Sequence, residues 1–155
     1  MVDLQVTTYI ALGANLGDAA SMVRTAMESI HALPHTQVVR RSALYLTTPV
    51  DSDGPDYVNA VVEVLTSFRA PQLLEQLQNL EQTKGRKRPY RNAPRTLDLD
   101  ILLFGSGHID SPTLKFPHPR MWQRAFVLRP LAEIAPHLVS PKQLRAVRDQ
   151  VVEKL

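Results

Sequence analysis

Residues 95–105, RTLDLDILLFG, alternate polar and apolar side chains as a half-buried β-strand does. Successive side chains of a strand point to opposite faces, so Leu99 and Ile101 are predicted to face a core. Asp98 and Asp100 then project together from the other face, with Cα atoms about 6.6 Å apart. Ionised carboxylates repel one another, and burying them without a partner is costly. The stretch therefore predicts a strand that carries concentrated negative charge on one face.

These residues alone leave two explanations of the aspartate pair open. The pair could be the solvated face of an edge strand, which is the simpler explanation because D-x-D is a short and common pattern. It could instead hold a hard divalent cation, since Mg²⁺ takes carboxylate oxygens and usually shares its shell with substrate phosphates. The upstream sequence favours the cation, because six of the 18 lysines and arginines fall between Lys84 and Arg95. Carboxylates for a metal beside guanidinium groups for phosphate are the parts needed for phosphoryl transfer.

The composition is that of an ordinary globular chain, with 155 residues, 44% hydrophobic and 21% charged. This length predicts one domain over 1–155. The net charge of +3 and the basic cluster predict an anionic partner.

The absence of cysteine excludes disulfides and thiolate chemistry, and we expect a cytoplasmic location. We expect no signal peptide and no membrane span, and the G-x-x-x-x-G-K-[ST] loop of many nucleotide-binding proteins is absent.

Outward from the opening stretch, periodicity predicts strands and helices in the order βαββαβ, followed by helices. Further strands are predicted over 7–13, 38–47 and 57–65, and helices over 18–33, from 71 to the basic cluster, over 128–134 and from 142. This order predicts an α+β sandwich with a mainly antiparallel sheet and helices on its faces. Glu81 continues the apolar stripe of the second helix, so its carboxylate is expected either to be paired or to reach solvent at the helix end.

Five segments of the chain resemble, in order, those of a known enzyme family. They are YIALGANLGD (9–18), PDYVNAVVEV (55–64), LEQTKGRKR (80–88), RNAPRTLDLDIL (91–102) and FPHPRMWQRAFVLRPLAEIAP (116–136). The family is 6-hydroxymethyl-7,8-dihydropterin pyrophosphokinase of folate biosynthesis. The resemblance implies a ferredoxin-like α/β sandwich and transfer of pyrophosphate from ATP to the hydroxymethyl oxygen of the pterin, with release of AMP. We expect ATP and the pterin as partners, neither nucleic acid nor membrane, and a monomer.

The resemblance also implies roles for individual residues. The catalytic positions would be Arg86, Arg95, Asp98 and Asp100, with two Mg²⁺ ions held by Asp98 and Asp100. The ATP-binding positions would be Gln78, Arg88, His118 and Arg124. The pterin-binding positions would be Thr47, Val50, Tyr57, Asn59 and Phe126, with the two aromatic rings stacked on the pterin. Without the resemblance, the aromatic residues would be read as core side chains and His118 as a turn residue between prolines.

The chain departs from many family members at Asn92-Ala93, where they carry an aromatic-glycine pair, and at Pro119, where some carry an aromatic residue. These departures concern the closed geometry of the nucleotide lid. Three other functions remain as alternatives: a small RNA-binding module, another Mg²⁺-dependent nucleotidyl or glycosyl transferase, and a catalytically inactive relative. The RNA-binding alternative lacks the aromatic strand motif of the common RNA-recognition fold.

Overall fold

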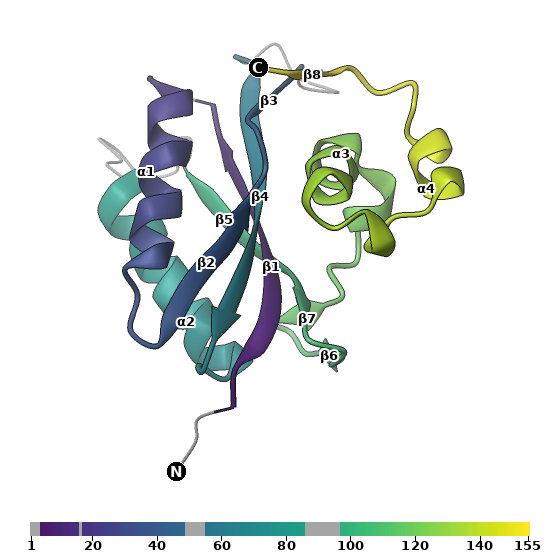
Figure 1. Cartoon of the computed structure of the whole chain (residues 1–155). Helices are drawn as coiled ribbons and strands as arrows, with labels where there is room; N and C mark the ends of the chain where they lie inside the picture. The colour runs from purple at the N-terminus through teal and green to yellow at the C-terminus, as the bar shows by residue number, and fades with distance from the viewer. Residues whose placement is uncertain (1–3, 16, 49–54, 86–96) are drawn as a thin grey trace.

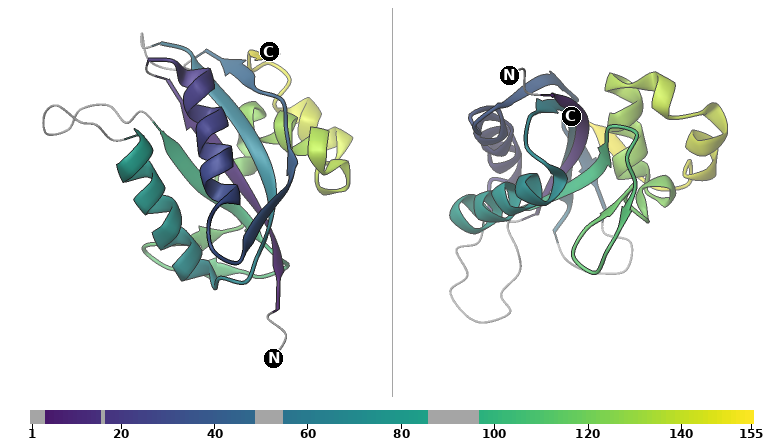
Figure 2. Two further views of the ribbon diagram at one scale, coloured as in Figure 1. Left: turned by 60° about the vertical axis from the view of Figure 1, so that its left-hand side comes forward. Right: turned by 90° about the horizontal axis from the view of Figure 1, so that it is seen from below.

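The computed structural model describes residues 4–15, 17–48, 55–85 and 97–155, which form three layers (Figure 1). A sheet lies in the middle. One of its faces is covered by α1 (Ala19–His31) and α2 (Ala70–Leu80), which lie side by side in Figure 2. The other face is covered by α3 (Ala125–Ile134), with α4 (Pro141–Ala146) packed beyond it. The described residues contain no helix with the length and apolar character needed to cross a membrane.

The main sheet is antiparallel throughout and has the order β5-β1-β4-β3-β8, with β2 also paired to β4. Its strands are β1 (Val6–Ala14), β2 (Thr36–Arg41), β3 (Tyr45–Thr47), β4 (Tyr57–Thr66), β5 (Asp98–Phe104) and β8 (Val152–Lys154). Two shorter strands, β6 (Ile109–Asp110) and β7 (Lys115–Phe116), pair with each other after β5. The predicted α+β class with a mainly antiparallel sheet is therefore confirmed.

The helices on the first face follow their predicted sequence signals. The Asp18 side chain caps α1 by accepting a hydrogen bond from the Ser21 N–H at 3.0 Å. The buried face of α1 consists of Val23, Ala26, Met27 and Ile30. In α2 the fully buried positions are Leu73 and Leu77, four residues apart on one face. The spacing of apolar residues therefore determines which side of each helix packs on the sheet.

Residues 98–104 of the opening stretch form β5, at the edge of the sheet that the described residues build. Its alternation is as predicted: Leu99 and Ile101 are buried on the α1/α2 side, and Asp100 is exposed on the opposite face. Leu97, just before the strand, is also buried. β5 therefore presents its carboxylates toward the α3 side of the sheet.

Three predicted elements differ from the structure. The strand predicted over 38–47 is two strands, both paired with β4, because the ladder is interrupted between them, where the Ser42 hydroxyl accepts a hydrogen bond from the Val61 N–H. Helix α3 begins at Ala125, three residues before the predicted start. The tail does not end in a helix, since β8 follows α4 and pairs with β3. A three-residue strand carries too little periodicity to be recognised without its partner.

Candidate active site

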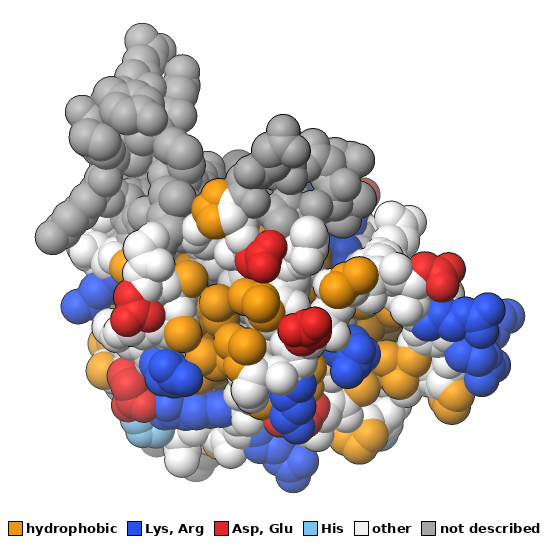
Figure 3. Space-filling view, turned by 90° about the horizontal axis from the view of Figure 1, so that it is seen from above, with side chains coloured by type: hydrophobic (Ala, Val, Ile, Leu, Met, Phe, Trp, Pro, Cys, Tyr) orange, Lys and Arg blue, Asp and Glu red, His pale blue; other side chains and the backbone are white. Residues whose placement is uncertain are grey.

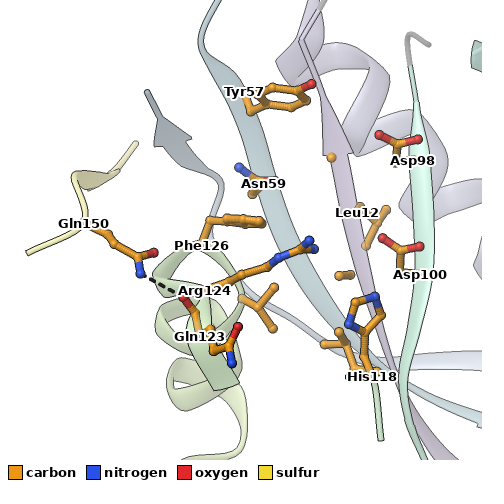
Figure 4. A pocket seen from close by; sticks show the side chains of 14 residues that line it. Leu12, Tyr57, Asn59, Asp98, Asp100, His118, Gln123, Arg124, Phe126 and Gln150 are labelled. Carbon is orange, nitrogen blue, oxygen red and sulfur yellow. Dashed lines mark hydrogen bonds between the residues drawn. The ribbon is translucent and has the colours of Figure 1, made fainter. Parts of the chain in front are cut away.

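A cavity of about 670 Å³ opens between the sheet and the N-terminal end of α3 (Figure 4). It brings together seven of the predicted site residues: Tyr57, Asn59, Asp98, Asp100, His118, Arg124 and Phe126. Strands β4 and β5 supply the first four, and the segment from His118 into α3 supplies the others. Thr47 and Gln78 are described but are not among the lining residues. Val50, Arg86, Arg88 and Arg95 lie outside the described residues.

The floor of the cavity is a row of three residues that cross the sheet. Asp98 of β5 is paired with Gly13 of β1, and Gly13 is paired with Asn59 of β4. Directly paired residues of antiparallel strands present their side chains on the same face. The amide and the carboxylate therefore stand two strands apart, roughly 10 Å at the backbone, with no side chain between them. The sequence prediction did not include Gly13, whose only signal was a glycine inside a strand pattern.

One half of the cavity offers an amide between aromatic rings. Asn59 is only 8% exposed, and its Nδ2 donates a hydrogen bond to the Thr47 hydroxyl at 2.8 Å. Thr47 thus orients the Asn59 amide, although it does not itself line the cavity. Tyr57 and Phe126 come from β4 and α3, on opposite sides of the Asn59 side chain in Figure 4. This half suits a flat ring with donors and acceptors at its edge.

Arg124 lies between the aromatic half of the cavity and the half that carries Asp98 and Asp100. Its guanidinium carbon lies 5.4 Å from the centre of the Phe126 ring, within cation–π range. Figure 4 shows its side chain extending across the cavity toward the β5 side. The positive charge therefore lies between the aromatic half and the two aspartates, where an anionic ligand would meet it.

The other half carries Asp98 and Asp100. Within the described ranges, no group of three or more His, Asp or Glu side chains is arranged to hold a metal ion. Two carboxylates on one strand face nevertheless fit Mg²⁺, because this ion is usually bound through one or two carboxylates together with substrate phosphates and water. The donor set therefore fits a metal that arrives with a phosphate ligand.

Glu81 anchors the aspartate strand from the side of α2. It is only 6% exposed, and its Oε2 accepts a hydrogen bond from the Leu99 N–H at 2.9 Å. Leu99 lies between the two aspartates in the sequence, so this bond fixes the backbone that carries both. Of the two alternatives for Glu81, the paired interior position is confirmed.

We expect replacement of Glu81 by alanine to lower the free energy of unfolding by about 1–3 kcal/mol, because the buried N–H of Leu99 loses its acceptor. Glu81→Gln keeps an acceptor oxygen at the same distance along the side chain and should lose less. Urea denaturation of the two variants would measure the difference. Equal stability of Glu81→Ala and the wild type would show that this hydrogen bond does not hold β5.

His118 lies beside Asp100 in the cavity, in surroundings that favour the neutral imidazole. Burial lowers its pKa, and the positive charges of Arg124 and Arg120 lower it further, whereas Asp100 opposes the shift. Its Nδ1 accepts a hydrogen bond from the Arg120 N–H at 3.2 Å, so the ring proton is assigned to Nε2. A neutral histidine in this place can donate a hydrogen bond to an anion.

A second cavity, of about 260 Å³, lies on the outer side of β5. It is lined by Leu74, Leu99, Asp100, Ile101, Pro112, Thr113, Leu114, Lys115, His118 and Pro119. Asp100 and His118 line both cavities. The sequence prediction missed the contribution of the β6–β7 hairpin, because two-residue strands leave no periodic signal. Two ligands could therefore lie in neighbouring cavities and meet at these shared polar residues.

Basic side chains are numerous on the surface around α4. Lys142, Arg145 and Arg148 are exposed along α4 and the turn after it. Figure 3 shows a cluster of basic side chains at the right-hand edge of the face seen from above and further basic side chains scattered over the rest of it, with acidic side chains among hydrophobic ones near its centre. The two acidic side chains that line the larger cavity, Asp98 and Asp100, both come from β5.

A family model described as 7,8-dihydro-6-hydroxymethylpterin-pyrophosphokinase (HPPK) matches residues 9–136. A 2-amino-4-hydroxy-6-hydroxymethyldihydropteridine pyrophosphokinase of Pseudomonas aeruginosa is 46% identical over 134 residues, which are 86% of this chain and 83% of the relative. The enzyme of the same name from Haemophilus influenzae is 44% identical, over 88% of this chain and 86% of the relative.

Solved structures agree at the level of the fold. A triple mutant of Plasmodium falciparum HPPK-DHPS superposes with a TM-score of 0.71 at 14% identity, over 96% of this chain and 43% of that one. The wild-type form of that protein gives a TM-score of 0.66 over 96% of this chain and 42% of that one. The chain thus spans about two fifths of these solved chains. The matched family model and the curated relatives show that the chain belongs to the 7,8-dihydro-6-hydroxymethylpterin-pyrophosphokinase family.

Proposed function

We propose that this chain is an ATP-dependent pyrophosphokinase that acts in folate biosynthesis. It transfers the β- and γ-phosphoryl groups of ATP to the hydroxymethyl oxygen of 6-hydroxymethyl-7,8-dihydropterin and releases AMP. The observation that carries the proposal is that a single cavity joins an amide between aromatic rings to a pair of carboxylates. Membership of the family, with relatives that bear the name of this activity, supports the same substrates.

The pterin occupies the half formed by Tyr57, Asn59 and Phe126. Its ring stacks between the two aromatic side chains, and the Asn59 amide reads its edge with both a donor and an acceptor. Thr47 holds that amide in place through the 2.8 Å hydrogen bond. Val50 belongs to the same proposed set. This arrangement points the hydroxymethyl group toward β5.

The nucleotide base and sugar occupy the second cavity, and the phosphates cross to the first one past Asp100 and His118. Leu74 and Ile101 supply apolar contact for a base, while Thr113 and Lys115 supply polar groups at the rim. Arg124 then faces the phosphates from the α3 side. Gln78, exposed on α2, remains in the proposed ATP set, as does Arg88.

The reaction forms a bond between the hydroxymethyl oxygen and the β-phosphorus, breaks the bond from that phosphorus to the AMP oxygen, and releases the proton of the hydroxyl group. Two Mg²⁺ ions, when bound with ATP, offset the negative charge of the phosphates. Asp98 and Asp100 would hold these ions, and Glu81 would keep the aspartate backbone in register through Leu99. Arg86 and Arg95 complete the proposed catalytic set as donors to the transferred group. The walls of the cavity would keep water away from the reacting phosphorus.

The proposed architecture is a single pyrophosphokinase domain over residues 1–155 with a ferredoxin-like arrangement. The order β5-β1-β4-β2, with α1 and α2 on one face, supports this description. We further propose that the enzyme is a cytoplasmic monomer that needs neither nucleic acid nor membrane.

An assay of AMP release tests the proposed function. With ATP, Mg²⁺ and the hydroxymethyl pterin, we expect one AMP for each pterin diphosphate formed, because the β-phosphorus is the site of attack. Removing the metal with EDTA should stop turnover, and added Mg²⁺ should restore it. Pyrophosphate as the released product would identify a nucleotidyl transferase instead. Tight binding of both substrates without AMP release would identify an inactive relative.

A further inference from the structure

The N-terminal end of α3 is held from a distant part of the chain. Arg124 occupies the N-cap position, and in the part of the chain that the structure describes its side chain makes no capping hydrogen bond. The first N–H groups of a helix have no partner within the helix and need one from elsewhere. The Gln150 side chain provides it: its Oε1 accepts a hydrogen bond from the Ala125 N–H at 2.9 Å.

The same amide makes a second contact. Gln150 Nε2 donates a hydrogen bond to the Gln123 carbonyl at 2.8 Å, drawn as the dashed line in Figure 4. The two ends of one side chain thus bind the backbone on both sides of Arg124. Fixing these two peptide groups also fixes the direction in which Arg124 and Phe126 leave the helix. Both of these side chains line the cavity, and the guanidinium lies over the ring.

Gln150 is itself attached to the other wall of the cavity. It lies two residues before β8, and Val152 of β8 is paired with Thr47 of β3. Thr47 in turn accepts the hydrogen bond from Asn59. The chain from Gln150 to Val152 therefore ties the end of α3 to the strand that orients the Asn59 amide. This segment also lies beyond residue 136, where the match to the family model ends.

We propose that Gln150 is a positioning residue for the pterin half of the site, which it assembles by holding Arg124 and Phe126 at a set distance from Asn59. The inference rests on the proposed function, because the pterin is the ligand whose binding reports the geometry. Gln150 lies at the lining of the cavity, and both ends of its amide are engaged with backbone groups, so the proposed role is to hold these groups rather than to bind the substrate.

Calorimetric binding of 6-hydroxymethyl-7,8-dihydropterin to the whole chain tests this role. We expect Gln150→Ala to raise the Kd for the pterin about three- to tenfold, in line with the loss of two exposed or partly buried hydrogen bonds. The pterin KM should rise to a similar extent, while kcat at saturating substrates changes less than about twofold. Gln150→Glu keeps an acceptor for the Ala125 N–H and places a negative charge at a helix N-terminus, so it should give an intermediate Kd.

Gln143 offers a matched control. Its Oε1 accepts a hydrogen bond from the Ser140 N–H at 2.8 Å at the start of α4, the same type of contact in a place that does not line the cavity. Gln143→Ala loses one side-chain hydrogen bond where Gln150→Ala loses two, so it should lower stability by a smaller amount and leave the pterin Kd unchanged. An unchanged pterin Kd in Gln150→Ala, or equal rises in the two variants, would overturn the positioning role. Failure of the wild type to bind the pterin would overturn the proposed function as well.

Discussion

Replacing either aspartate of β5 with asparagine should reduce turnover by roughly 10²–10³-fold, the range found when one preorganised charge-stabilising group is lost. Asp98→Asn and Asp100→Asn keep the shape of the side chain but remove the charge that a metal with a phosphate ligand requires. The expected loss lies in kcat, because the interaction is strongest when the transferred group carries its greatest charge. AMP release at saturating ATP and Mg²⁺ would measure it.

The fold should survive these changes. Asp100 is exposed and Asp98 partly exposed, so neither side chain forms part of the core. Glu28→Gln is a suitable control, since it removes one carboxylate from an exposed ion pair with Arg41 on the far side of the sheet. It should leave turnover unchanged. Near-normal turnover of both aspartate variants at high Mg²⁺ would mean that the pair is the solvated edge of a strand and nothing more.

The strand that bears these aspartates could be predicted because its information is local. Alternation of Leu99 and Ile101 with Asp98 and Asp100 decides which side chains enter the core, and no distant partner is needed for that decision. The hydrogen-bond partner of Glu81, in contrast, could not be predicted from the sequence. The sequence indicated that a carboxylate on an apolar stripe needs a partner, but the partner is a backbone N–H 18 residues away. Almost every residue has a backbone N–H, so the residue types in the sequence do not reveal which one is the partner of Glu81.

The C-terminal segment could be predicted even less well, because its contacts also depend on parts of the chain that are distant in sequence. Strand β8, VEK, has too few residues for a periodic pattern, and its pairing with β3 follows from the position of that strand's free edge in the folded sheet. Gln150 carries no sequence signal, because an exposed glutamine in a polar tail is ordinary. Its contacts with Gln123 and Ala125 exist only once α3 has packed on the sheet. Predictions for Arg86, Arg88, Arg95 and Val50 stay predictions, since these residues lie outside the described ranges.

Gly13 gives the second large expected effect: we expect Gly13→Val to lower kcat/KM for the pterin about 10²-fold or more. A Cβ at this position would lie 3.0 Å from Asn59 Oδ1, closer than an ordinary van der Waals contact. The amide cannot turn away without cost, because its Nδ2 is bonded to Thr47 and the side chain is buried. The two methyl groups of valine add bulk to the floor between Asn59 and Asp98. A displacement of about 1 Å in a reacting group can cost such a factor.

Gly13→Ala should cause a smaller loss of the same kind, and Gly107→Ala provides the control. A Cβ at Gly107 would meet the Phe104 carbonyl at 3.2 Å and the Phe116 ring at 3.3 Å, so its crowding is comparable. Gly107 lines neither cavity, and the variant should therefore lose some stability but keep its affinity for the pterin. If Gly13→Val binds the pterin and turns over like the wild type, the row Asp98–Gly13–Asn59 cannot be the floor on which the two substrates meet. The loss of kcat/KM in Gly13→Val should persist at a lower temperature at which the variant is fully folded. Crowding between Gly13 and Asn59 acts within the folded protein and does not depend on the fraction of protein that is folded.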